Sequence, residues 1–458
     1  MRDVTGRWWW SGRGRGPGGD PGPARGACRR AHRRAAAWLA AGLLTLQALC
    51  GCGALGPGSA PAVPDGDRKA VRALLDRWSA ALRDRDERAF LAAVDPAAEG
   101  YRAEQRRVFA NLAAVPLASW EYRLVRTGGF APAQGDGRRL AAETELSYRL
   151  AGYDKAPVTT KARLTVVERA GRWYVTAEDA PRGGRQLWQQ GPVTAVRGAR
   201  SLVLGVGQDR ARLEALAAAA DRAVPAVAAA WRDGGPGEGG GDGGEGPGAW
   251  PGRVVVQIPA SVERMAALLD SPVSNYRGIA AVTTGEVGGS GEAPADRIIV
   301  NPEAYGALGS FGRQVVLTHE TAHVATRTLT SAATPLWLSE GFADWAAYRG
   351  TDRTARQAAP ELARAVAAGK APRGLPTDAD FGFAGESGRL ARAYEEGWLA
   401  CRMIAERWGE DKLVAFYRGV GGHERRSGAV GAELRRVLGV SQVEFTAAWR
   451  AYVERELG

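Results

Sequence analysis

The chain has 458 residues, 45% of them hydrophobic, so it can form two or three domains with buried cores. Its formal charge of +11 is uneven, because nine Arg and two Asp within residues 1–51 contribute +7 and leave +4 for the rest. This remainder has no basic stripe with interleaved aromatic residues, which argues against nucleic acid as a partner.

The N-terminal segment has the charge order of a secretory signal. An apolar stretch over 35–49 is too short to span a bilayer and suits a signal-peptide core. Four arginines precede it: Arg29, Arg30, Arg33 and Arg34. It ends in Leu49-Cys50-Gly51-Cys52, which resembles the lipobox of bacterial lipoproteins and implies cleavage before Cys52 and lipidation of its sulfur. We therefore predict a signal peptide over 1–51 and an extracytoplasmic chain anchored to the cell membrane by lipid. An ordinary secretory signal with incidental cysteines is the alternative.

A first domain is predicted over 67–190, after a flexible Gly-, Pro- and Ala-rich tether over 52–66. Apolar residues recur at helical spacing over 68–96. Three stretches of alternating polarity then predict strands, over 119–127, 139–150 and 159–179, the last a hairpin turning at Ala170-Gly171. Helix followed by antiparallel meander resembles the NTF2-like or cystatin-like α+β fold. Such domains hold a small pocket or only pack and dimerise, and no catalytic constellation is visible in this one.

A second domain is predicted over 191–458. It begins with a hairpin over 193–206 and a helix over 209–231. A Gly-rich insertion over 232–252 is expected to be disordered from its composition. Further strands are expected over 253–258, 278–287 and 296–302, and a short helix over 261–270. From Gly309 onward the pattern is nearly all helical, with loops near 370–388 and 421–428, so the predicted fold class is α+β.

The stretch "LTHETAHVATR" holds two of the four histidines in the chain. On a helix starting near Ser310, His319 and His323 lie on one face, about 5–6 Å apart at Cβ. Two imidazoles so placed can bind one metal ion at about 2.0–2.1 Å. Glu320 lies about 100° around the helix from His319, where it flanks the ion and can take a proton from water. Two packed helix histidines are the alternative interpretation.

The next predicted helix, over 334–348, adds two acids. Glu340 lies 17 residues after His323, and Asp344 follows one helical turn later. Together with His319-Glu320-x-x-His323 this pattern resembles the gluzincin branch of the zinc metallopeptidases, and the surrounding sequence resembles their peptidase-MA-like members. The resemblance implies one Zn²⁺ bound by His319, His323 and Glu340. A solvated helix face is the alternative for both acids.

The resemblance also assigns roles to residues that do not bind zinc. Glu320 is implied as the general base, and Asp344 as acceptor of the free N–H of a ligand histidine. Gluzincins stabilise the oxyanion with a downstream Tyr or His. Here we favour Tyr394, at an expected helix start, over His423 in an expected turn; a core or surface tyrosine is the alternative for Tyr394.

Other zinc classes do not fit the sequence. The metzincin pattern needs a Gly and a third His after His323, and neither follows. A structural Cys/His site needs a cysteine pair, which the mature chain lacks.

We therefore predict a membrane-anchored zinc metallopeptidase that hydrolyses peptides or proteins, with the first domain spacing the catalytic domain from the membrane. The alternative is a non-catalytic cell-envelope lipoprotein that binds peptide or cell-wall ligands and keeps zinc for structure. Intact Glu320 favours the enzyme, because a degenerate site has no chemical need for it. A zinc-storage or chaperone lipoprotein would have His-rich tracts, and none is present.

Overall fold

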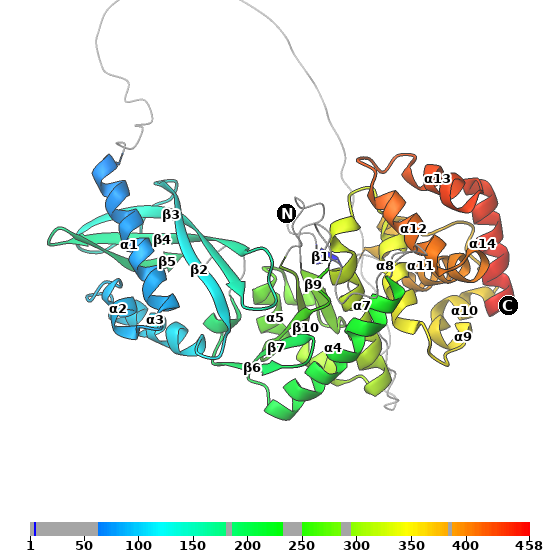
Figure 1. The fold of residues 1–458 in the computed structure, drawn as a ribbon, viewed down its shortest axis with the longest axis horizontal. Coiled ribbons are helices and arrows are strands. Elements are labelled where there is room, and N and C mark those ends of the chain that lie inside the picture. Colours follow the sequence, from blue (N-terminus) through cyan, green and yellow to red (C-terminus); the bar gives the residue numbers. More distant parts are fainter. Residues whose placement is uncertain (1–3, 6–62, 180–185, 232–249, 285–294, 383–386) are drawn as a thin grey trace, which may run out of the picture.

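A computed structural model describes residues 4–5, 63–179, 186–231, 250–284, 295–382 and 387–458. Cys52, nearly all of the predicted signal peptide and most of the predicted Gly-rich insertion lie outside these ranges. The fold is α+β, as predicted: a helical and antiparallel N-terminal part, then a mixed sheet, then a largely helical C-terminal part (Figure 1).

The N-terminal module, residues 63–190, packs three helices against a four-stranded antiparallel sheet in the order β2-β3-β4-β5. The first helix, α1, buries an apolar stripe that includes Trp78, whose ring stacks 4.7 Å from that of Tyr122. The expected meander is confirmed, but the helical stretch over 68–96 is broken, because Arg85 adopts a positive φ and Asp86 caps a new helix. A third helix was not predicted. The elements are α1 (Asp65–Arg83), α2 (Glu87–Ala92), α3 (Glu99–Asn111), β2 (Leu117–Thr127), β3 (Arg138–Leu150), β4 (Val158–Arg169) and β5 (Arg172–Asp179).

A mixed six-stranded sheet follows, in the order β1-β9-β10-β8-β7-β6. The pairs β7–β8 and β8–β10 are parallel and the others are antiparallel. Strands buried on both faces are expected to be continuously apolar, which explains runs such as "RVVVQI". The elements are β1 (Val4–Thr5), β6 (Val193–Arg197), β7 (Ser201–Val206), α4 (Arg210–Ala230), β8 (Val254–Ile258), α5 (Val262–Leu268), β9 (Ala281–Thr284) and β10 (Arg297–Val300).

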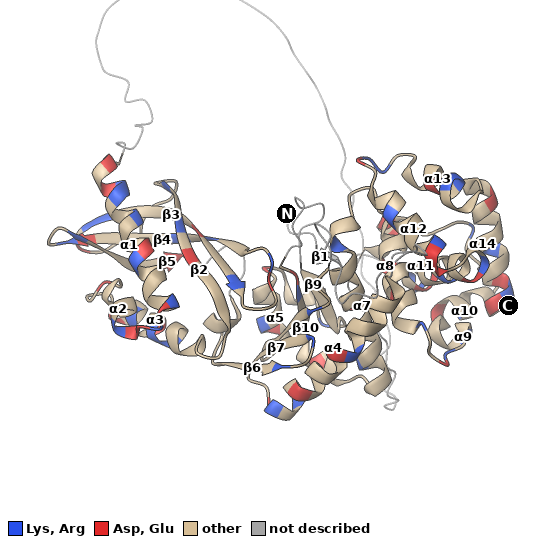
Figure 2. Cartoon of the chain, in the orientation of Figure 1, with Lys and Arg blue, Asp and Glu red and all other residues tan. Residues whose placement is uncertain are grey.

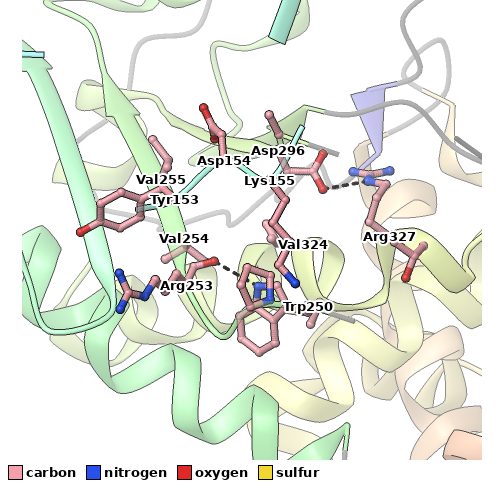
Figure 3. A pocket seen from close by; sticks show the side chains of 14 residues that line it. Tyr153, Asp154, Lys155, Trp250, Arg253, Val254, Val255, Asp296, Val324 and Arg327 are labelled. Atoms are coloured by element: carbon pink, nitrogen blue, oxygen red, sulfur yellow. Dashed lines mark hydrogen bonds and ion pairs between the residues drawn. The ribbon is translucent and has the colours of Figure 1, made fainter. Parts of the chain in front are cut away.

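The two faces of this sheet contribute to different cores. Val203 and Ile298 pack in one hydrophobic cluster with α4 and the later helix α7 (Ser310–Thr326). Their neighbours Leu202 and Ile299 belong to a second cluster that runs on without interruption into the N-terminal module. A small cavity of about 30 Å³ remains at this junction, beside Trp250 (Figure 3). The module and the mixed sheet therefore share a core.

The C-terminal part is helical, and the expected loop near 421–428 separates two of its helices. The described residues of the other expected loop, near 370–388, lie mostly between two further helices and include a 3-10 turn at Asp378–Phe381. In the described part of the chain, no helix is both long and apolar enough to cross a membrane. Acidic and basic residues are interspersed along the helices in Figure 2. Some of them form ion pairs one helical turn apart, as Arg402 and Glu406 do. The helices are α6 (Pro302–Gly306), α7 (Ser310–Thr326), α8 (Leu336–Tyr348), α9 (Ala355–Ala358), α10 (Pro360–Ala367), α11 (Ser387–Trp408), α12 (Glu410–Gly421), α13 (Ala429–Glu433) and α14 (Gln442–Leu457).

Candidate metal centre

Helix α7 carries both histidines of the predicted site. His319 and His323 are 0% and 3% exposed, because the helix packs between α4, α8 and the mixed sheet. Their rings meet edge to face, with centroids 4.8 Å apart, and their Nε2 atoms lie 3.1 Å from each other. The spacing of four residues has placed two imidazoles together, as the sequence predicted.

Helix α8 brings Glu340 to the same point. It begins after Pro335, and its first N–H group, at Leu336, donates to the Asp378 carboxylate. Glu340 Oε2 lies 3.3 Å from Nε2 of each histidine. This oxygen is buried and has no properly oriented hydrogen bond among the described residues. The three residues form a group that can hold one metal ion.

The spacing of these three atoms fits zinc. Around a tetrahedral ion with bonds of about 2.0–2.1 Å, neighbouring ligand atoms are about 3.3–3.4 Å apart. The observed separations are 3.1, 3.3 and 3.3 Å. Two imidazole nitrogens and a carboxylate oxygen are also a donor set that Zn²⁺ accepts. The described residues thus supply three ligands, as catalytic zinc sites do.

Asp344 lies one helical turn after Glu340 and contacts His319 at Nδ1, the ring nitrogen that is not part of the triangle of ligand atoms. Its Oδ1 is 2.8 Å from Nδ1 of His319. When Nδ1–H donates to this carboxylate, the lone pair of Nε2 points at the centre of the site, which is the tautomer that a metal requires. The contact predicted for Asp344 is therefore present.

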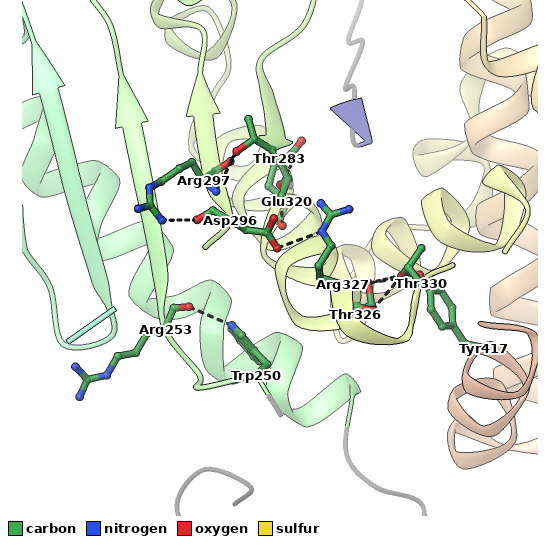
Figure 4. Close-up of polar contacts among 11 residues, drawn as sticks. Trp250, Arg253, Thr283, Asp296, Arg297, Glu320, Thr326, Arg327, Thr330 and Tyr417 are labelled. Atoms are coloured by element: carbon green, nitrogen blue, oxygen red, sulfur yellow. Dashed lines mark hydrogen bonds and ion pairs between the residues drawn. The ribbon is translucent and has the colours of Figure 1, made fainter. Parts of the chain in front are cut away.

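Glu320 is fully buried beside the three ligand atoms but is not part of their group. Thr283, on strand β9, donates from Oγ1 to Glu320 Oε2 at 2.6 Å (Figure 4). The other oxygen, Oε1, has no hydrogen-bond partner among the described residues. One carboxylate oxygen is thus held while the other is available, an arrangement that suits a base. Thr283 was not identified from the sequence, where the only signal is a polar residue within an apolar predicted strand.

The acid–base balance of the site reflects burial and close charges. Burial lowers the pKa of His319, but Asp344 and Glu340 outweigh it and raise the pKa to about 10. Burial raises the pKa of Glu340, but His323 and His319 outweigh it and lower the pKa to about 2. Burial raises the pKa of Glu320 to about 8 against the opposing effect of His319. The neighbouring carboxylates therefore favour the doubly protonated form of His319, and a metal ion binding at Nε2 would compete with the proton there.

Tyr394 approaches the site from α11. Its ring centroid lies 6.4 Å from that of His319 and 5.2 Å from that of Phe381. It stands seven residues into α11 rather than at a helix start as expected. Glycine at position 341 allows α8 and α11 to pack closely enough to bring Tyr394 near the site. A Cβ on Gly341 of α8 would lie 2.2 Å from the carbonyl oxygen of Gly397 in α11.

The rival residue, His423, lies in the expected loop after α12. Its Nε2 is 3.0 Å from the carboxylate of Glu433, which is not one of the three residues of the candidate metal centre. Its side chain is 35% exposed, in contrast to the buried histidines of α7.

Neither a protein-family model nor a curated protein matches this chain. The buried His-His-Glu group and the residues around it are therefore the basis for inferring its chemistry.

Replacing Asp344 by Asn tests the contact behind His319. An amide in this place cannot carry the charge that orients and polarises the imidazole, so we expect zinc affinity to fall by about 10–100-fold without loss of the fold. Competition with a chromophoric chelator measures this affinity. Asp411→Asn, at an exposed position of α12, serves as control. An unchanged affinity in Asp344→Asn would show that the contact does not support metal binding.

Proposed function

We propose that this protein is a zinc-dependent peptidase that cleaves peptide bonds in peptides or proteins. The observation that carries the proposal is the triangle of His319 Nε2, His323 Nε2 and Glu340 Oε2, with ligand-like separations, beside a buried glutamate that is not in the group. Three ligands leave a coordination position open, which is the feature that separates catalytic from structural zinc sites.

Zinc held by these residues would supply a Lewis acid that polarises a water molecule and the substrate carbonyl. The protein provides the proton transfers. Glu320, held through Oε2 by Thr283, accepts a proton from water at Oε1 and then delivers it to the leaving amine. Tyr394 is our proposed donor to the oxyanion, through its hydroxyl.

The edge of the mixed sheet supports an extended peptide as substrate. Strand β9 carries Thr283 and packs against α7, so its edge on the side away from β10 lies next to the general base. Residues Val4 and Thr5 of the chain itself pair with this edge in antiparallel register, opposite Thr284 and Thr283. An edge that accepts one extended segment has the hydrogen-bonding groups to accept a substrate strand.

We also propose the location predicted from the sequence. Lipidation at Cys52 would anchor the chain to the outer side of the cell membrane, so its substrates would be extracytoplasmic. The competing function is a non-catalytic lipoprotein with structural zinc. It is disfavoured by Glu320, a buried acid that is not in the ligand group and whose Oε1 has no hydrogen-bond partner among the described residues, since a site that only holds metal does not need such a group.

Metal removal tests the peptidase directly. The chain from Gly53 onward should cleave members of a mixed peptide library, lose cleavage on dialysis against 1,10-phenanthroline, and regain it with one equivalent of zinc. Mass spectrometry of the library detects the products. Cleavage that persists in metal-free protein, or a zinc-loaded protein that cleaves nothing, would contradict the proposal.

A further inference from the structure

Two neighbouring residues at the start of β10 point in opposite directions. Successive side chains of an extended segment face opposite sides of a sheet. Arg297 is on the side of Ile299, which belongs to the core shared with the N-terminal module. Asp296 is on the side of Ile298, which packs with α7. The start of β10 therefore lies between the module and α7. Figure 4 shows Asp296 facing Arg327, just beyond the end of α7.

Arg297 is bound by the N-terminal module. Its Nη1 and Nη2 atoms each lie 2.7 Å from a carboxylate oxygen of Asp154, in the turn between β3 and β4. The two side chains are 5% and 1% exposed. Asp154 is fixed in turn, because its Oδ2 also accepts the N–H of Leu150. A bidentate pair of this kind specifies orientation as well as distance.

Asp296 is bound to the metal-binding helix. Its Oδ2 accepts from Nε of Arg327 at 3.2 Å, and both side chains are buried. Arg327 directly follows the last residue of α7 and lies four residues beyond His323. Burial raises the pKa of Asp296 to about 6, although Arg327 opposes the shift. Buried ion pairs add little net stability, so orientation is the better explanation for this one.

Other contacts keep the same turn in place. The hydroxyl of Tyr153 donates to the carbonyl of Ser201, and Arg253 donates to the carbonyl of Gly152. The cavity beside them, about 30 Å³, has room for about one or two water molecules (Figure 3). The junction is thus a packed interface that holds the turn against the sheet.

We propose that the N-terminal module positions the metal-binding helix, through the series Asp154, Arg297, Asp296 and Arg327. These four are positioning residues, since the contacts described for them hold the C-terminal end of α7 and none of these contacts is with a ligand atom. The module is then a working part of the metal centre and more than a spacer. The consequence for zinc affinity rests on the proposed metal site; the consequence for the order of α7 does not.

Amide hydrogen exchange in the full protein tests the proposal, with Asp154→Asn as the main variant. Asp95→Asn is the matched control. Asp95 is also a buried carboxylate in a bidentate pair, with Arg169, but both partners lie within the module. Global stability is compared from the thermal midpoints, so that local loosening of α7 can be separated from general destabilisation.

We expect α7 amides to exchange at least about tenfold faster in Asp154→Asn than in Asp95→Asn, with a parallel loss of zinc affinity. Asp296→Asn should loosen α7 equally while the turn carrying Asp154 stays protected, and it decides the matter if Asp154→Asn folds poorly. The proposal would be overturned if the α7 amides exchanged at the same rate in Asp154→Asn as in Asp95→Asn. It would also be overturned if they exchanged at the same rate in Asp296→Asn as in the wild type. A wild type that binds no zinc would refute the proposed function, and the exchange comparison would still decide this inference.

Discussion

Replacing Glu320 by Gln is expected to abolish peptide cleavage and to leave one zinc bound per chain. Glutamine keeps the shape of the side chain and can still contact Thr283, but it cannot accept a proton. Loss of a general base costs about 10²–10⁴-fold in rate. Because Glu320 is not in the ligand group, zinc content should stay at the wild-type value. Rates on a cleaved library peptide, together with elemental mass spectrometry, measure both quantities.

The control for this variant is Glu433→Gln, another change at a buried glutamate. Glu433 binds His423 and Arg436 and has no contact with the triad among those described. This variant should cleave at the wild-type rate. If Glu320→Gln cleaved as fast as Glu433→Gln, the assigned base would be wrong.

The second large effect is expected for His323→Ala, which should lose both zinc and cleavage. The substitution removes one of three ligand atoms and leaves Glu340 with one imidazole neighbour in place of two. Loss of a residue that only contacts a metal ligand lowers metal affinity by up to about 100-fold. Loss of the ligand itself should lower zinc affinity by more than this. The measurement is zinc per chain after equilibrium dialysis at neutral pH.

His423→Ala is the matched control, since it removes a histidine that is paired with Glu433 outside the metal centre. It should keep one zinc per chain. Zinc retained in His323→Ala at wild-type affinity would mean that the metal binds elsewhere. The pair of variants thus distinguishes the triad from adventitious binding to histidine.

The ligand group was predictable because its geometry is mostly local. His319 and His323 share a helix face by their spacing alone. The same rule places Glu340 and Asp344 on one face of the next helix. Only the packing of α8 against α7 had to be assumed, and the structure brings Glu340 to both histidines. Most strands and long helices were likewise predictable from periodicity, with α3 as an exception, and the α+β class is confirmed.

The supporting contacts were not predictable, because they join positions far apart in the chain. Thr283 and Glu320 are 37 residues apart, and Asp154 and Arg297 are 143 residues apart. No period in the sequence marks such pairs; they exist only once the sheet and the module have packed. For the same reason the role of Tyr394 stays a prediction, although the structure brings its ring near His319.

Anomalous diffraction at the zinc edge, from crystals of the zinc-loaded protein, tests the central claim most directly. We predict a single strong peak about 2.0–2.1 Å from Nε2 of His319, Nε2 of His323 and the near carboxylate oxygen of Glu340, with Glu320 outside the coordination sphere. A map with no peak between these residues, or with Glu320 as a direct ligand, would contradict the account.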